Sequence, residues 1–167
     1  MPSLAHEGLL YTIAEVAAAF VGFSLVVGLL SGEPSDRHRF HSIRDVAEVG
    51  LTSLGAALLP AAVYAFGLDP ETTWRLASGI FFVGWVAAAF VGIRRFFRSG
   101  AHREAPRFLV TGPVVTVAGN LLLCWNVLRP GPLAPARYVL ALLLLLAFAG
   151  LSFISATFHG RDREPST

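Results

Sequence analysis

Hydrophobic side chains are gathered into five long stretches, and most polar residues fall between them. Each stretch holds about 20 residues, the length that an α-helix needs to cross a hydrocarbon core of roughly 30 Å. The connections are short and carry Gly, Pro and most of the charge. The pattern predicts an all-α integral membrane bundle of about five transmembrane helices in a single domain, 1–167, with spans near residues 9–30, 43–66, 74–96, 108–128 and 137–158.

The composition favours lipid rather than water as the solvent. Hydrophobic residues make up 54% of the chain and charged residues 14%, whereas about 25% of a typical soluble domain is charged. The mean hydropathy is +0.63. The N-terminus lacks the basic region and cleavage site of a secretory signal, so we expect the first stretch to remain as a span.

The basic residues predict an orientation. All 13 are arginine, and ten of them flank the first connection, the third connection and the C-terminal tail. The opposite side holds only Arg75, Arg129 and Arg137. The positive-inside rule therefore predicts an outside N-terminus and a cytoplasmic C-terminus. Because topology accounts for the positive charge, no nucleic-acid partner is expected.

The first span carries Glu15, Ala18 and Gly22 on one face. Small residues four positions apart let helix backbones approach closely in a bilayer, so this face is expected to meet another helix. A charged side chain near the centre of a span costs about 2.5–3.5 kcal/mol. Glu15 is therefore interpreted either as a proton or cation site or as a structural partner of Arg75 or Arg137, from the outer ends of spans three and five.

The second span contains a start signal and a breaker. Ser42 and Asp45 form a capping-box pattern, which predicts that the helix begins near Ser42. Pro60 lacks the backbone N–H that a helix needs, so it should kink the outer half unless neighbouring groups fill the gap.

Glu48 is the second intramembrane carboxylate, and Thr52 follows it one turn later. Arg44 precedes Glu48 by one turn and can pair with it, although this order is the weaker one on a helix. Alternatively, Glu48 pairs across helices with Arg95 or Asn120. Its functional interpretation is a protonatable relay.

Spans three to five supply further polar and apolar signals. Span three ends in Arg94, Arg95 and Arg98, which are expected to reach anionic headgroups at the cytoplasmic surface. In span four, Thr116, Asn120 and Cys124 share one face, and Asn120 is expected to face another helix because lipid offers it no partner. Span five, with the run Leu142–Leu146, is interpreted as the most lipid-exposed.

No motif of a common enzyme class is present. The sequence lacks Gly-x-Ser-x-Gly, His-Glu-x-x-His, a Gly-rich phosphate loop and Cys-x-x-Cys. Its single cysteine excludes an internal disulfide. Four histidines lie in the predicted loops and tail: His38, His41, His102 and His159. They could form a metal site or a pH sensor, but they have no acidic or thiolate side chains beside them and are expected to be solvated. Neither a metal nor a cofactor is therefore expected.

Three segments carry a resemblance: residues 14–23, the Leu58-Leu59-Pro60 step, and Trp125-Asn126-Val127-Leu128 before a Pro-rich turn. In these the chain resembles small, uncharacterised multi-span bacterial membrane proteins. The resemblance implies a bacterial inner membrane and no particular activity.

Two functional classes remain open. In the first, the chain is a structural or accessory membrane protein whose carboxylates hold helices together, with membrane lipids and a homo-oligomer or another membrane protein as partners. In the second, it is an oligomeric conduit for protons or a small ion, lined by Glu15, Glu48, Thr52, Thr116 and Asn120. The conduit requires these polar side chains to converge on a shared cavity or oligomer axis.

Overall fold

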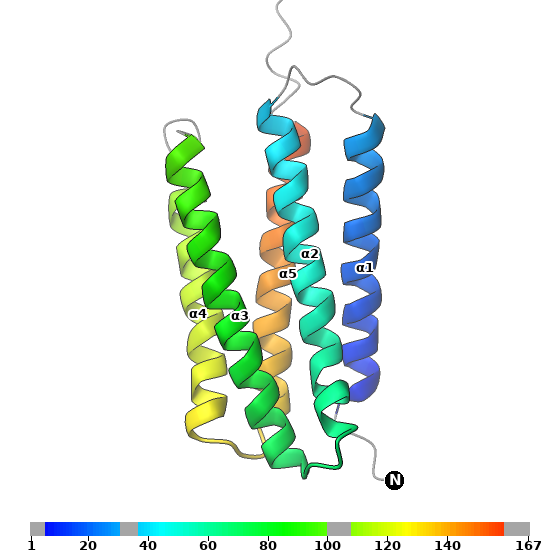
Figure 1. Cartoon of the computed structure of the whole chain (residues 1–167), viewed down its shortest axis with the longest axis vertical. Helices are drawn as coiled ribbons and strands as arrows, with labels where there is room; N and C mark the ends of the chain where they lie inside the picture. Colours follow the sequence, from blue (N-terminus) through cyan, green and yellow to red (C-terminus); the bar gives the residue numbers. More distant parts are fainter. Residues whose placement is uncertain (1–5, 31–36, 100–107, 159–167) are drawn as a thin grey trace, which may run out of the picture.

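The computed structural model describes residues 6–30, 37–99 and 108–158 of the chain. These ranges form five α-helices and no strand (Figure 1). The predicted all-α membrane bundle is confirmed, and the bounds predicted for the fourth span agree with the structure. The helices are α1 (Glu7–Leu30), α2 (Arg37–Tyr64), α3 (Pro70–Ser99), α4 (Phe108–Leu128) and α5 (Ala134–Phe158).

Consecutive helices run antiparallel (Figure 1). The connections at residues 65–69 and 129–133 lie at one end of the bundle, which we call the turn end. Gly67 has a φ of 78°, a left-handed conformation that glycine adopts without steric cost, and it lets the chain leave α2. Asp69 then accepts a hydrogen bond of 2.9 Å from the Thr72 amide and so caps α3. The glycine and the capping aspartate that form this turn lie two residues apart in the sequence.

Helices α2 and α5 occupy the centre of the arrangement, because α5 packs against all four other helices and α2 packs against α1, α3 and α5. Helix α1 lies at the edge and contacts mainly α2 (Figure 1). The two helices approach closely at Gly50, where an added Cβ would lie 2.8 Å from Cγ2 of Val21 and 3.3 Å from the carbonyl oxygen of Ala17. Glycine is therefore required for this close approach.

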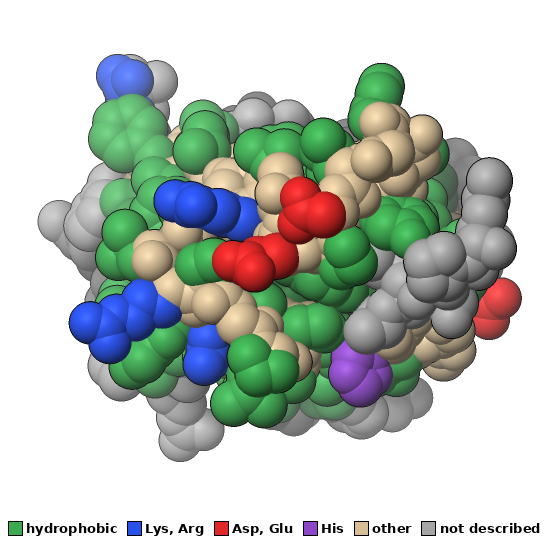
Figure 2. Space-filling view, turned by 90° about the horizontal axis from the view of Figure 1, so that it is seen from below, with side chains coloured by type: hydrophobic (Ala, Val, Ile, Leu, Met, Phe, Trp, Pro, Cys, Tyr) green, Lys and Arg blue, Asp and Glu red, His purple; other side chains and the backbone are tan. Residues whose placement is uncertain are grey.

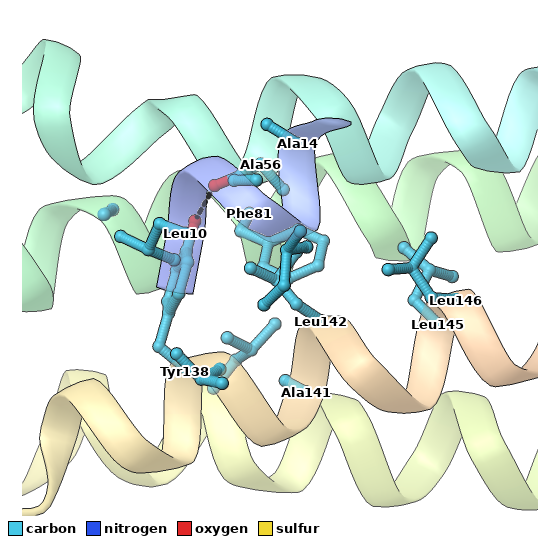
Figure 3. Close-up of a cluster of buried hydrophobic side chains, with 14 of the residues drawn as sticks. Leu10, Ala14, Ala56, Phe81, Tyr138, Ala141, Leu142, Leu145 and Leu146 are labelled. Atoms are coloured by element: carbon cyan, nitrogen blue, oxygen red, sulfur yellow. Dashed lines mark hydrogen bonds between the residues drawn. The ribbon is translucent and has the colours of Figure 1, made fainter. Parts of the chain in front are cut away.

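The core is built from aromatic and aliphatic side chains of all five helices, and Figure 3 shows its members from α1, α2, α3 and α5. Trp74 and Tyr138 meet edge to face with ring centroids 5.5 Å apart, and Phe81 stacks on Trp85 at 5.4 Å. All four are buried. These ring contacts fill this part of the core with apolar side chains.

The outer surface of the bundle is also apolar, as a bilayer requires. Large hydrophobic side chains are exposed on several helices, among them Phe23, Phe90 and Leu121. Helices α1, α2, α3 and α5 are long and apolar enough to cross a membrane. The apolar part of α4, Gly112–Leu128, is shorter. Helix α3 ends at one end of the bundle and α5 begins at the other (Figure 1). Helix α4 connects these two ends, so it runs the same length of the bundle as its neighbours.

Two predictions about individual spans are wrong. Helix α2 begins at Arg37 rather than near Ser42, since neither Pro nor Gly lies between Pro34 and Ser42 to stop an earlier start. Span five is the most buried candidate span rather than the most exposed, with 50% of its residues buried. In the Leu142–Leu146 run, Leu142 is fully buried whereas Leu143 is 45% exposed. Hydrophobicity alone does not separate a core-facing leucine from a lipid-facing one.

Candidate functional site

Glu15 lies on the outside of the bundle. It is exposed, and it is eight residues from the start of α1, or about 12 Å along the helix axis. Ala18 and Gly22, on the same face, are exposed as well, and nothing lies within 4 Å of a Cβ built on Gly22. The prediction that this face meets another helix is therefore wrong within the chain, because Ala17 and Val21 make the close contact with α2 instead.

Glu48 is also exposed, on α2. Thr52 is half-buried, and its hydroxyl donates a hydrogen bond of 2.8 Å to the carbonyl oxygen of Glu48. This bond uses the backbone of the same helix, so the Thr52 hydroxyl is satisfied locally. The side chains of Arg44 and Arg95, the predicted partners of Glu48, lie outside the described residues.

The two carboxylates point away from each other. Gly50 faces Ala17 at the α1–α2 contact, and each glutamate lies two residues before one of these positions. Two residues correspond to about 200° around a helix. Glu15 therefore faces away from α2, and Glu48 faces away from α1. They do not share a cavity within one chain.

The predicted polar face of α4 is partly covered by the rest of the bundle. Thr116, Asn120 and Cys124 are all half-buried. The Asn120 amide donates a hydrogen bond of 2.8 Å to the Thr116 carbonyl oxygen of its own helix. Its Oδ1 is shielded and has no partner among the described residues. Asn120 thus joins neither Glu15 nor Glu48 in a polar pathway.

A second asparagine, which the sequence interpretation passed over, is fully buried near the turn end. The Asn126 amide donates to the Ala134 carbonyl oxygen at 2.8 Å and to the Ser78 hydroxyl at 3.3 Å. It therefore connects α3, α4 and the start of α5. An asparagine in an apolar span is a signal in itself, but its partners are distant in sequence and only the fold brings them together.

A tyrosine from α5 compensates for the missing N–H of Pro60, and Figure 3 shows its hydrogen bond to Ala56 of α2. Pro60 has no N–H to donate to the carbonyl oxygen of Ala56, four residues earlier. The buried Tyr138 hydroxyl donates to that oxygen at 2.6 Å. Helix α2 continues through Pro60 to Tyr64. One hydrogen bond thus satisfies the freed carbonyl group and joins α2 to α5.

Neither of the arginines proposed as partners of Glu15 forms an ion pair with it. Arg75 is exposed on α3, whereas α1 packs mainly against α2. Arg137 donates a hydrogen bond of 3.4 Å to the Arg129 carbonyl oxygen and lies 5.5 Å from the centre of the Trp125 ring. Among the described residues, Glu15 forms no ion pair.

The opposite end of α3 carries the arginines expected at lipid headgroups. Arg94 is exposed, with its guanidinium 5.9 Å from the centre of the Phe90 ring. The side chains of Arg95 and Arg98 lie outside the described residues, so their headgroup contacts stay a prediction.

The turn end carries charges of both signs. Figure 2 shows basic and acidic side chains next to one another on this face, with hydrophobic side chains around them. Hydrogen bonds from the backbone amide and the side chain of Thr72 lower the pKa of Asp69, which is fully exposed. Mixed charge is expected where helix ends reach the headgroup region.

Within the described part of the chain, no three His, Cys, Asp or Glu residues gather closely enough to hold a metal ion. The side chains of His38 and His41, and the whole of His102 and His159, lie outside that part.

Comparison with protein-family models, curated proteins and solved structures found no match to the chain. The site is therefore interpreted from its own geometry. Among the described residues, that geometry consists of an apolar core and two exposed carboxylates, Glu15 and Glu48.

Proposed function

We propose that the chain is a structural or accessory protein of a bacterial inner membrane, which self-associates through the outward face of α1. One observation carries the proposal: Glu15 lies outside the bundle, among the small residues Ala18 and Gly22. A carboxylate in lipid costs about 2.5–3.5 kcal/mol near a helix centre. A second protein surface with a hydrogen-bond donor lowers that cost, and the small residues let another helix approach.

The packed interior argues against a conduit inside one chain. A polar path needs side chains that line a continuous cavity. The buried Ser24 and Ser53 instead donate to carbonyl oxygens of their own helices at 2.7 and 2.9 Å. Of the other buried polar side chains, Thr73 donates to the Asp69 carbonyl oxygen, and Asn126 donates to the Ser78 hydroxyl and the Ala134 carbonyl oxygen. A conduit between copies would require Glu15 to face an oligomer axis, and proton flux distinguishes that alternative.

The orientation is also part of the proposal. Arg75, Arg129 and Arg137 are the only arginines predicted near the turn end, so this end is assigned to the outer surface. An alkaline-phosphatase fusion after Thr167 is expected to be inactive. Phosphatase activity in the periplasm would reverse the assignment.

Cysteine cross-linking in membranes tests the α1 contact. In a Cys124→Ser background, Ala18→Cys is expected to give a dimer with a short bismaleimide, and Leu121→Cys on the exposed side of α4 is the matched control. Adding Gly22→Leu should weaken the Ala18→Cys cross-link, because it fills the small-residue face without touching the bundle. Equal cross-linking at both positions, or no effect of Gly22→Leu, would contradict the proposal.

A further inference from the structure

A groove runs along the outside of α3 and α4 near the turn end. It has a volume of about 540 Å³, and its walls are mainly apolar. Gly79 of α3 lies in it, and a Cβ added there would stand 3.8 Å from Cγ2 of Val127 on α4. Behind the groove, the hydrogen bond between Ser78 and Asn126 joins the same two helices. The groove therefore lies between helices that are held together at this level.

The polar groups of the groove are confined to one end. Thr72 and Arg75 line it in the first turns of α3, whereas Ile80 and Val83 line its deeper part. From Thr72 to Val83 the groove extends over 11 residues, or about 16 Å along the helix. Half of a hydrocarbon core of roughly 30 Å has nearly the same thickness. The arginine at the surface end matches the charged headgroup of a phospholipid, and the apolar part of the groove, one leaflet deep, matches an acyl chain.

We propose that the α3–α4 groove binds one anionic phospholipid from the leaflet at the turn end. The Arg75 guanidinium pairs with the headgroup phosphate at the polar end of the groove. One acyl chain lies along Gly79, Ile80 and Val83. A guanidinium is well suited to phosphate oxygens, because its N–H groups form two parallel hydrogen bonds.

The acidic side chains near Arg75 leave it available for this role. Glu71 lies one turn earlier on α3, yet no ion pair with Arg75 is formed among the described residues. The Asp69 carboxylate accepts a hydrogen bond from the Thr72 amide and caps the helix. A phosphate at Arg75 would lie deeper in the membrane than either acid, since both precede it on α3.

The experiment is native mass spectrometry of the delipidated full chain, titrated with phosphatidylglycerol or with phosphatidylcholine of identical acyl chains. Wild type is expected to bind one phosphatidylglycerol more tightly than phosphatidylcholine. Arg75→Gln should lower phosphatidylglycerol affinity by about fivefold, which corresponds to about 1 kcal/mol. Arg129→Gln is the matched control, an exposed arginine at the same end that does not line the groove.

A second variant tests the acyl-chain site independently of the charge. Gly79→Leu should weaken both lipids, because its side chain fills the groove while its Cβ makes only an ordinary contact with Val127. Circular dichroism is used to verify that each variant is folded. Unchanged lipid binding in both Arg75→Gln and Gly79→Leu would overturn the proposal, as would an equal loss in Arg129→Gln. A dimer that Gly79→Leu abolishes would show that a protein helix, not lipid, occupies the groove.

Discussion

Pro60 and Tyr138 show how one missing N–H is compensated by a residue 78 positions away in the sequence. The sequence predicts the defect, since proline in the interior of a helix leaves the carbonyl group four residues earlier without its N–H partner. It does not predict the donor, because Tyr138 reaches Ala56 only after α5 has packed against α2. The same limit applies to Asn126, whose partners lie on α3 and α5.

Tyr138→Phe should therefore lower the free energy of unfolding by about 1–2 kcal/mol, because it leaves the Ala56 carbonyl group buried without a donor. In a Pro60→Ala background the new amide can bond to Ala56, so the same substitution should cost less. A double-mutant cycle in mixed micelles measures the coupling. Equal costs of Tyr138→Phe in both backgrounds would mean that the hydroxyl does not serve the proline gap.

Asp69 is expected to contribute a pH dependence at the turn end. Its folded-state pKa is lowered by hydrogen bonds from Thr72, so its contribution is present above the unfolded pKa of about 3.9. It is lost as the pH falls through the folded pKa. Thermal unfolding from pH 7 to pH 3 should show this loss in wild type. Asp69→Asn keeps a capping side chain without the charge, and an undiminished acid response in that variant would exclude Asp69 as its source.

Close packing between two helices requires small residues at the positions where the helices meet. The Glu15–Ala18–Gly22 face and the Gly50 contact both contain small residues, but only Gly50 is used within the chain. A small-residue pattern indicates that a face can pack closely, not which partner it meets. The predicted face on α1 was therefore wrong for this bundle, whereas the five helices themselves followed from segment length and hydrophobicity.

Gly119 provides a test of the α3–α4 contact. A Cβ at this position would overlap the Trp85 ring, which is buried and stacked on Phe81 and so cannot move freely. Gly119→Ala should lower the free energy of unfolding by about 1–3 kcal/mol through overpacking. Gly92→Ala is the control, since nothing lies within 4 Å of its Cβ and alanine favours the helix. Equal effects of the two substitutions would show that Trp85 does not pack on Gly119.

For the whole molecule, the sequence was sufficient for the fold class but not for the arrangement of the polar residues. Charges and apolar runs mark the spans because lipid forbids unpaired polar groups along them. Whether the side chains of Glu15, Glu48 and Asn120 meet at one site depends instead on how each helix is rotated about its axis and on which helices pack beside it. The structure places the two glutamates on outward faces of different helices, and Asn120 bonds to its own helix.

Proton flux into liposomes tests most directly whether the chain is accessory or a conduit. Purified wild type, Glu15→Gln and Glu48→Gln are reconstituted around a pH-sensitive dye, and a pH gradient is imposed. With the interior closed and the carboxylates outside it, all three should acidify the lumen no faster than protein-free liposomes. Rapid acidification by wild type that Glu15→Gln or Glu48→Gln abolishes, with the variant still folded, would contradict this account.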